Sequence, residues 1–270
     1  MTDADPVETS DDDPDVTPLL APADGVPPVA IYASDIARAG ELLASGHGAF
    51  AIDAERASGF RYSNRAYLVQ IRRSGAGTVL IDPVNHGGDS LTVMAPVARV
   101  LATDEWVLHA ADQDLPCLAE QGLRPDRLFD TELDARVAGL PRVGLAAVLE
   151  ELLGVTLAKE HSAADWSVRP LPEAMLTYAA LDVELLVPLR EALIARLARY
   201  AARRGLSADW EAAKASDEEM LVNSLSMMLP FSPEEKQALL ESPTLSDRRE
   251  MLDGLLEFAL RGGDDEETIQ

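Results

Sequence analysis

The sequence is short of the residues that mark secreted, membrane-spanning or strongly nucleic-acid-binding chains. Cys117 is the only cysteine, so no internal disulfide can form, which favours a reducing compartment. No apolar run reaches the length of about 18 residues that a transmembrane helix needs. No basic segment followed by an apolar run marks a signal peptide. We therefore expect a cytoplasmic location and no contact with a membrane.

Basic residues are also scarce. The chain has 23 Lys and Arg against 47 Asp and Glu, a net charge of -24, and much of the excess lies at its two ends. Phosphate contacts need Lys and Arg, so such a chain is a poor non-specific binder of nucleic acid. Any function on nucleic acid must therefore depend on a local site.

The composition divides the chain into four parts. Residues 1–28 are rich in Asp, Pro and Thr and poor in large apolar side chains, which predicts a disordered acidic tail. Residues 29–203 alternate strand and helix patterns and form the expected main domain. Residues 204–262 predict a small helical segment, and residues 263–270 a second disordered acidic tail.

The pattern within residues 29–203 predicts an α/β fold. Strands around Asp53 and over 66–71 and 78–82 have short connections, which favours an antiparallel meander. Further strands at 106–109 and 128–130 alternate with helices at 91–101, 112–121, 131–139 and 144–153. Ser34 is the expected cap of a first helix, and one long helix is expected from about Pro172 to about Arg203. Together these elements predict a mixed sheet flanked by helices.

Acidic residues inside the strand around Asp53 carry the first functional signal. Side chains alternate along a strand, so Asp53 and Glu55 point to one face while Ile52 and Ala54 point to the other. Two neighbouring carboxylates repel each other and are costly to bury. A divalent cation with oxygen ligands relieves this repulsion. The stretch therefore predicts a metal site on the sheet.

Two further groups of polar residues complete a candidate site. Tyr178 and Asp182 are four residues apart on the last helix and therefore share a helix face. Asp112 and Asp114 follow His109 at a strand-to-helix junction, where either carboxylate could simply cap the helix. His109 itself follows an apolar strand, so a structural role is favoured over a role as a ligand.

These motifs, in this order, resemble the DEDD superfamily of 3′–5′ exonucleases, in the subgroup with tyrosine in the third motif. The closest resemblance is to ribonuclease D and covers about residues 30–195. Shorter phrases agree with it: Phe129-Asp130-Thr131, Lys159-Glu160-His161-Ser162 and Asp165-Trp166-Ser167-Val168-Arg169-Pro170-Leu171.

The resemblance implies a ribonuclease H-like fold and hydrolysis of phosphodiester bonds with two metal ions. It selects Asp114 over Asp112, so that Asp53, Glu55, Asp114 and Asp182 would hold two Mg²⁺ or Mn²⁺ ions, about 3.5–4 Å apart in such sites. Tyr178 would orient the attacking water, because a phenol with a pKa of about 10 is a poor base at neutral pH.

The resemblance also implies a substrate: RNA with a single-stranded 3′ end, such as a tRNA precursor. Arg56, Arg61, Arg65 and Arg169 are candidate contacts to its backbone, although surface ion pairs are an equal alternative. His161 is a candidate substrate contact. Trp166 would either stack on a base or pack in the core. The alternative functions are a 3′–5′ exonuclease acting on DNA and a catalytically weak interaction protein.

The last part of the chain departs from the ribonuclease D pattern. It lacks the basic HRDC modules that normally follow in that family. Instead, residues 195–262 resemble the helical end of Lon-type substrate-binding domains. Helix starts are expected at Ser216, at Ser232 with a capping box and Pro233, and at Ser246. These helices are expected to cap the nuclease or to bind a protein partner.

Overall fold

The computed structural model describes residues 16–157, 164–203, 222–223, 225–227 and 231–262. The strands are β1 (Thr17–Leu19), β2 (Val29–Ala30), β3 (His47–Arg56), β4 (Ala66–Ser74), β5 (Gly77–Ile81), β6 (Trp106–Leu108), β7 (Leu128–Asp130) and β8 (Val155–Leu157). The helices are α1 (Ala33–Ser45), α2 (Ser90–Leu101), α3 (Ala111–Glu120), α4 (Thr131–Val137), α5 (Leu145–Leu153), α6 (Glu173–Asp182), α7 (Leu186–Arg203), α10 (Pro233–Glu241) and α11 (Leu245–Gly262).

Six strands form one mixed sheet in the order β2-β5-β4-β3-β6-β7. The pairs β3–β4 and β4–β5 are antiparallel, which confirms the predicted meander. The strands β2, β6 and β7 pair in parallel with their neighbours. The α/β fold with a mixed sheet and flanking helices is therefore confirmed, and β3, with its two acidic residues, lies inside the sheet.

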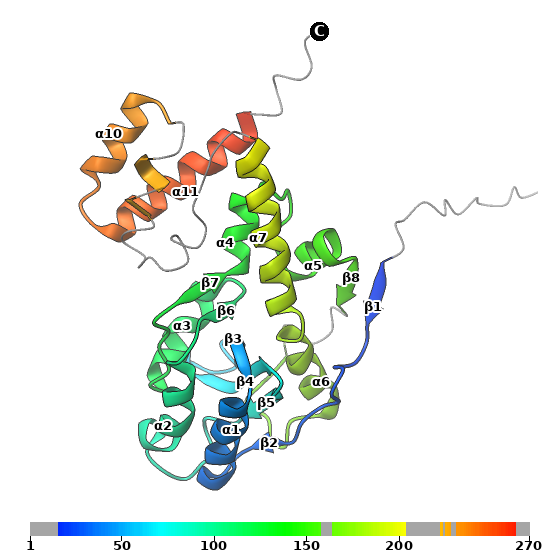
Figure 1. Cartoon of the computed structure of the whole chain (residues 1–270). Coiled ribbons are helices and arrows are strands. Elements are labelled where there is room, and N and C mark those ends of the chain that lie inside the picture. Colours follow the sequence, from blue (N-terminus) through cyan, green and yellow to red (C-terminus); the bar gives the residue numbers. More distant parts are fainter. Residues whose placement is uncertain (1–15, 158–163, 204–221, 224, 228–230, 263–270) are drawn as a thin grey trace, which may run out of the picture.

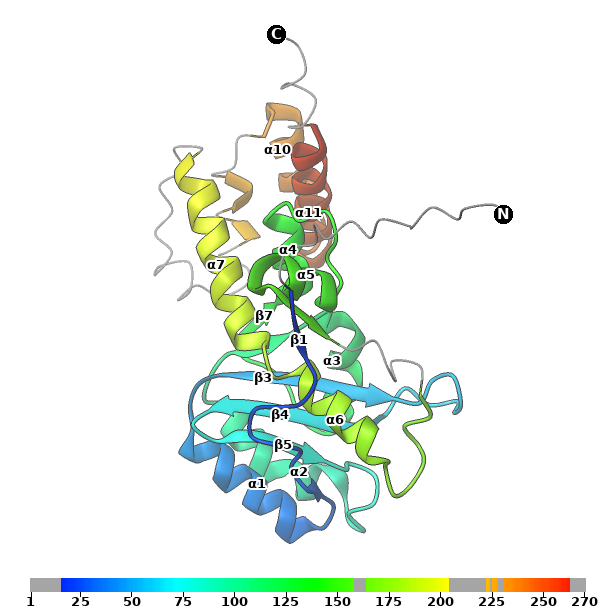
Figure 2. The same cartoon turned by 90° about the vertical axis from the view of Figure 1, so that its right-hand side faces the viewer.

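Helices cover both faces of this sheet (Figures 1 and 2). On one face α1, α2 and α3 bury Ile36, Met94 and Leu118 against apolar residues of β3, β4 and β5. On the other face α6 packs Met175 and Ala179 over Leu68 and Leu80. Successive side chains of β3 point to opposite faces of the sheet. The polar side chains of β3 can therefore reach solvent only where no helix covers their face.

The long helix expected from Pro172 to Arg203 is two helices. The first, α6, ends at Asp182, and α7 begins at Leu186. Pro188 explains the break: proline has no N–H to donate, and its ring clashes with the carbonyl four residues earlier, at Glu184. The break places Asp182 at the carboxyl end of α6, where α7 is free to leave in a new direction.

Two of the expected helix caps are displaced. The first helix begins after Tyr32 rather than Ser34, and Asp35 Oδ2 accepts a bond from the Tyr32 N–H at 3.4 Å. At the other end of the chain, α11 begins at Leu245 rather than after Ser246, and Thr244 Oγ1 accepts from the Asp247 N–H at 3.1 Å. The capping box at Ser232 is confirmed, while Ser216 lies outside the described residues.

Residues 16–28 belong to the folded part, which corrects the expected boundary of the acidic tail. The strand β1 pairs in parallel with β8. Asp24 Oδ2 pairs with Arg72 Nη1 at 2.8 Å, and the Ala23 N–H donates to Glu184 at 3.4 Å. Strand β8 offered an unpaired edge to this segment, which composition alone could not show. The expected tails at 1–15 and 263–270 lie outside the described residues.

The C-terminal helices have a small core of their own, made by Val222, Leu239 and Leu252. Arg248 joins this group, donating to Asn223 Oδ1 at 2.6 Å and to the Leu239 carbonyl at 3.0 Å.

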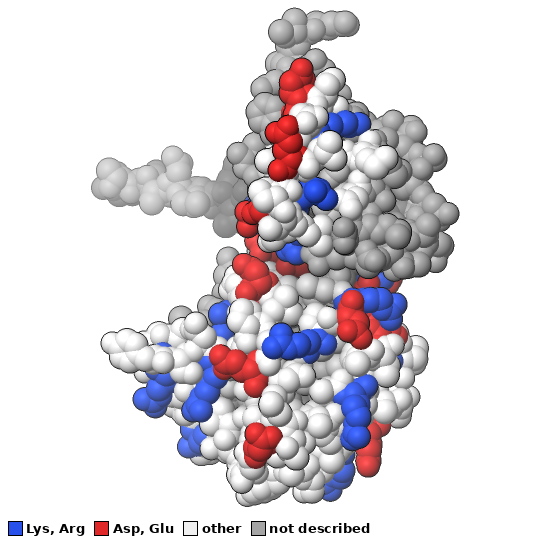
Figure 3. All heavy atoms as spheres, turned by 90° about the vertical axis from the view of Figure 1, so that its left-hand side faces the viewer, with Lys and Arg blue, Asp and Glu red and all other residues white. Residues whose placement is uncertain are grey.

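On the face shown in Figure 3, acidic and basic side chains are interspersed. Within the described residues, no helix has the length and apolarity to cross a membrane.

Candidate active site

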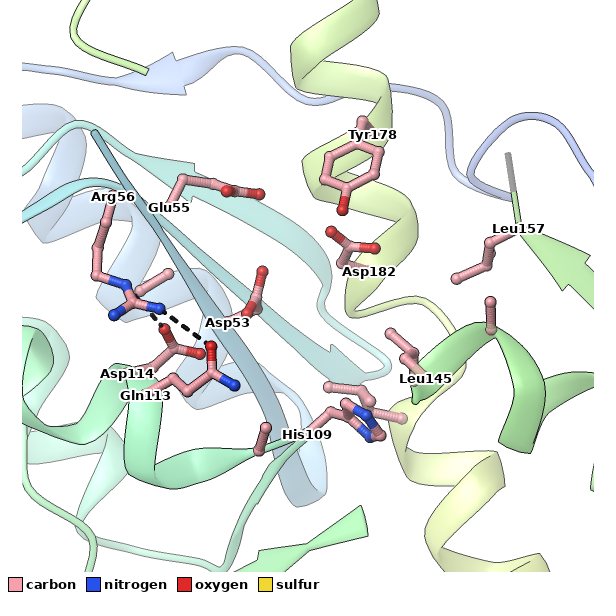
Figure 4. A pocket seen from close by; sticks show the side chains of 14 residues that line it. Asp53, Glu55, Arg56, His109, Gln113, Asp114, Leu145, Leu157, Tyr178 and Asp182 are labelled. Atoms are coloured by element: carbon pink, nitrogen blue, oxygen red, sulfur yellow. Dashed lines mark hydrogen bonds and ion pairs between the residues drawn. The ribbon is translucent and has the colours of Figure 1, made fainter. Parts of the chain in front are cut away.

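The two acidic residues of β3 lie on the same face of the sheet, as their spacing predicts. Both line a cavity of about 400 Å³, together with Asp114, Tyr178 and Asp182. Figure 4 shows these five side chains directed towards a shared space, from β3, from α3 and from α6. A cavity of this size is within the range of pockets that hold small ligands. The structure therefore gathers the five expected residues around one cavity, although the group with mutually close ligand atoms is Asp53, Glu55 and Asp182, without Asp114.

Helix α6 contributes two of these side chains one turn apart. The hydroxyl of Tyr178 forms a hydrogen bond with the carboxyl group of Asp182. Behind Tyr178 lies the buried ring of Trp166, with its centroid 6.3 Å away and tilted by 41°. The side chain of Tyr178 is thus held between the floor of the cavity and an aromatic support.

Asp114 comes from the first turn of α3, and a carboxylate of β7 holds this turn in place. Asp130 Oδ1 accepts from the Ala110 N–H at 3.0 Å, and its Oδ2 accepts from the Ala111 N–H at 2.8 Å. Ala110 has a left-handed backbone with φ of 54°, which costs free energy for a residue with a Cβ. The same carboxylate caps α4 by accepting from the Glu132 N–H at 2.9 Å.

His109 is placed by the same junction and also lines the cavity. Its Nδ1 lies 2.9 Å from Thr131 Oγ1, and Thr131 Oγ1 also donates to the Leu108 carbonyl at 3.1 Å. Burial lowers the pKa of His109, against the opposing effect of Asp130 and Glu132. Asp112, the alternative to Asp114, is exposed and lies outside the cavity lining.

The carboxylates form a donor set that fits divalent cations. Oxygen atoms of Asp53, Glu55 and Asp182 lie within 4.8 Å of one another. Burial raises the pKa of each of these groups, and the charge of Asp53 raises those of Glu55 and Asp182 further. Burial and the charge of Asp53 raise the pKa of Asp114 to about 9. Cations bound here would oppose these shifts, because their charge favours the ionised carboxylates.

The phenol of Tyr178 remains protonated at neutral pH. Burial raises its pKa above the ordinary range, and the negative charges of Asp182, Glu55 and Asp53 raise it further. A group in this state donates a hydrogen bond but does not remove a proton. The role of Tyr178 in orienting the attacking water stays a prediction.

Gln70 is a residue of this site that the sequence analysis missed. It is fully buried on β4, directly opposite Asp53 in the strand pairing. Its Nε2 donates to Asp53 Oδ2 at 2.9 Å and to Glu55 Oε1 at 3.2 Å. Gln70 thus holds both carboxylates of β3. The available signal was a single amide within the apolar run Tyr67-Leu68-Val69-Gln70-Ile71, where an unpaired polar group would be costly.

Of the candidate substrate-binding residues, one lines the cavity and the others that the structure describes lie outside its lining. Arg56 lines the cavity, where its Nε lies 3.6 Å from Asp114 Oδ1 and its Nη2 donates to Gln113 Oε1 at 3.4 Å. Arg61 and Arg65 are exposed on the loop that follows β3, outside the cavity lining. His161 lies outside the described residues.

Arg169 and Trp166, the other two candidates, make contacts within the protein. The guanidinium of Arg169 donates to Asp82 Oδ2 at 2.7 Å, to the Tyr67 carbonyl at 2.7 Å and to the Trp166 carbonyl at 2.8 Å. Trp166 is only 1% exposed, so no base can stack on it. Its indole Nε1 has no hydrogen-bond partner within the described part of the chain. Trp166 packs in the same cluster as Met175 and Ala179 of α6, and Arg169 holds the backbone at Trp166.

The fold and the site define a class of protein. The sequence profile of the family described as 3′–5′ exonuclease matches residues 29–198, and the chain belongs to this family. Among curated relatives, ribonuclease D of Acidiphilium cryptum is 39% identical over 135 residues, which are 49% of this chain and 34% of that protein. Ribonuclease D of Escherichia coli is 35% identical over 150 residues, 54% of this chain and 38% of that protein. The resemblance to ribonuclease D is thereby confirmed.

Solved structures agree with the sequence relatives. A protein from Bifidobacterium adolescentis is 39% identical, with a TM-score of 0.67, over 90% of this chain and 59% of that chain. The Escherichia coli RNase D structure has a TM-score of 0.53 and 24% identity, over 86% of this chain and 66% of that chain, and supports the fold. The match with these two ribonuclease D proteins spans less than two fifths of their length. The Lon-type resemblance has no support among these comparisons.

Proposed function

We propose that this chain is a divalent-metal-dependent 3′–5′ exoribonuclease that removes nucleotides from the 3′ end of RNA. The observation that carries the proposal is the cluster of carboxylates from β3, α3 and α6 around one cavity, with Tyr178 beside them. Escherichia coli RNase D is described as an exoribonuclease involved in structured RNA processing. By analogy, a tRNA precursor or another structured RNA with a single-stranded 3′ end is the substrate we favour.

Each group of residues has a separate role in the proposed reaction. Asp53, Glu55, Asp114 and Asp182 would hold the cations, which when bound activate water and stabilise charge on the leaving oxygen. Gln70 would hold the two carboxylates of β3 in fixed orientations. The protonated phenol of Tyr178 would donate to, and so orient, the attacking water. Arg56, which lies beside Asp114, would pair with the scissile phosphate once Asp114 binds a cation.

The test uses an RNA labelled at its 5′ end, with a single-stranded 3′ tail, incubated with Mg²⁺ or Mn²⁺. A ladder that shortens one nucleotide at a time from the 3′ end supports the proposal. The ladder should be absent with EDTA and with the Asp53→Asn variant. The same assay on a DNA of matched sequence tests whether the enzyme requires ribose. Faster degradation of that DNA would overturn the assignment to RNA.

The alternative of a catalytically weak interaction protein makes a different prediction. Such a protein would keep its fold but would lack a working metal site. A ligand that binds only the folded state raises the melting temperature. A folded protein that shows no shift with millimolar Mn²⁺ and no cleavage of either polymer would favour that alternative.

A further inference from the structure

The loop between β3 and β4, residues 57–65, projects from the molecule beside the cavity. Phe60 is 53% exposed and Tyr62 is fully exposed, although aromatic side chains are scarce in this chain. The adjacent Val168 is also exposed, at 40%. Exposing large apolar side chains to water is unfavourable unless a partner covers them. Several such side chains grouped on one loop therefore mark a binding surface.

Two cations flank these rings. Arg61 and Arg65 form no ion pair within the described residues, whereas several other arginines do. The pKa of Asp165 is lowered by its bond to Ser167 and, to a smaller extent, by the charge of Arg61. Both arginines are held in place. Arg61 Nε donates to Ser167 Oγ at 3.0 Å, and the guanidinium of Arg65 lies over the Tyr67 ring, 4.9 Å from its centroid. Fixed guanidinium groups without a paired carboxylate suit phosphate groups.

The loop is connected to the cavity on two sides. It follows Arg56 of the cavity rim directly, and a turn brings Phe60 back, with its N–H donating to the Ala57 carbonyl at 2.9 Å. On the other side, Ser167 follows Trp166, which supports Tyr178. Figure 2 shows this loop and the segment that precedes α6 side by side at the right-hand edge of the sheet.

From these observations we propose that the loop 57–65 is a stacking platform for the single-stranded RNA that leads into the cavity. The inference rests on the proposed exoribonuclease function. The cavity has room for about one terminal nucleotide, so the nucleotides on its 5′ side must leave over the rim. There, Phe60 and Tyr62 stack on bases while Arg61 and Arg65 bind phosphates. The platform explains how an acidic chain holds RNA locally.

Binding of a fluorescent ten-nucleotide RNA, in Ca²⁺ to slow hydrolysis, tests the platform. Each of Phe60→Ala and Tyr62→Ala is expected to weaken binding about fivefold or more, since stacking is sequence-tolerant and strong. The conservative variant Tyr62→Phe keeps the ring and should keep binding. Tyr32→Ala, which removes an exposed tyrosine before α1, is the matched control and should leave binding unchanged.

The arginines are tested by salt dependence. For single strands, removing one arginine that binds a phosphate should reduce the slope of log affinity against log salt by about 0.7. We expect this for Arg61→Gln and for Arg65→Gln. Arg99→Gln, which removes an exposed arginine on α2, should leave the slope unchanged. Unchanged slopes for both loop variants, with unchanged affinity for both aromatic variants, would overturn the platform.

Hydrolysis of a short and a long substrate separates this inference from the proposed function. A dinucleotide cannot reach the platform, so the Phe60→Ala/Tyr62→Ala double variant should cleave it normally while its KM for the ten-nucleotide RNA rises about 25-fold or more. Equal loss on both substrates would overturn the platform. If the unmodified protein cleaves neither substrate, the proposed function fails, and the binding measurements still decide the platform.

Discussion

At the scale of single residues, the site depends on how buried carboxylates are held before a cation binds. Asp53 and Glu55 share one amide donor, Gln70, and Asp114 pairs with Arg56 at 3.6 Å. Asp182 bonds to Tyr178. Each carboxylate therefore has a partner that fixes its direction. Such partners commonly tune metal affinity as strongly as they tune geometry.

The variant Gln70→Leu tests the amide. Leucine is close to glutamine in size but donates no hydrogen bond, so Asp53 and Glu55 would lose their common partner. We expect activity or affinity for Mn²⁺ to fall roughly 10- to 100-fold. The measurement is the Mn²⁺ concentration that gives half-maximal hydrolysis, with melting temperature as the check on folding. An unchanged Mn²⁺ dependence would show that Gln70 does not position the carboxylates.

The variant Tyr178→Phe tests the phenol. It removes only the hydroxyl, so the ring still packs on Trp166, and we expect kcat to fall about 100-fold because the water is no longer oriented. The rise in melting temperature on adding Mn²⁺ should persist, because the four carboxylates remain. Full activity in this variant would contradict the proposed role. Loss of the Mn²⁺ effect would instead indicate that the hydroxyl helps to shape the metal site.

At the scale of elements, the site depends on segments that hold α6 and α3 against the sheet. Asp82, at the end of β5, is 1% exposed and accepts from Arg169, from Asn85 and from the Val84 N–H. Burial would raise its pKa, but these bonds together lower it. Arg169 in turn holds the backbone that carries Trp166. The chain of contacts thus runs from β5 to the aromatic support of Tyr178.

The variant Arg169→Met breaks this chain at its centre. Asp82 would keep its bonds to residues 84 and 85 but its buried carboxylate would lose the partly exposed Arg169 cation, at a cost of about 2 kcal/mol in the free energy of unfolding. We expect the loss in chemical denaturation, together with reduced kcat from a poorly supported Tyr178. Arg142→Met is the matched control, because its pair with Glu150 is long, at 3.8 Å, and exposed. Equal effects of the two variants would contradict this account.

At the scale of the whole molecule, buried acids couple stability to pH and to metal. The pKa of Asp114 is raised to about 9, and those of Asp53, Glu55 and Asp182 are also raised. A carboxyl group with a raised pKa binds more protons in the folded state than in the unfolded state. Its contribution to stability is therefore present at low pH and is lost as pH rises.

We accordingly expect the metal-free protein to melt at a lower temperature at pH 8 than at pH 5.5. The loss begins above the unfolded pKa of about 4 and, for Asp114, continues to about pH 9. Added Mn²⁺ should raise the melting temperature more at pH 8 than at pH 5.5, because fewer protons compete. The Asp114→Asn variant should flatten the metal-free profile. A metal effect that is independent of pH would contradict the assignment.

The division of the chain was partly predictable at the same scale. The alternation of strands and helices over residues 29–203 predicted the mixed sheet, and the capping box at Ser232 predicted the start of α10. The segment 16–28 was misjudged because β1 is stabilised by pairing with β8, more than a hundred residues away. Composition reports the cost of ordering a segment but not the strand edge that offsets this cost.

The sequence by itself determined which residues could hold metal, because that follows from local rules. A period of two placed Asp53 and Glu55 on one face of β3, and a spacing of four placed Tyr178 and Asp182 on one face of α6. Only the tertiary structure decided what surrounds these groups. It brought Gln70 within hydrogen-bond distance of two carboxylates. It also directed Arg169 and Trp166 to partners inside the protein and left Phe60 and Tyr62 exposed. Side-chain partners of this kind lie on other elements, and no local period in the sequence encodes the distance between elements.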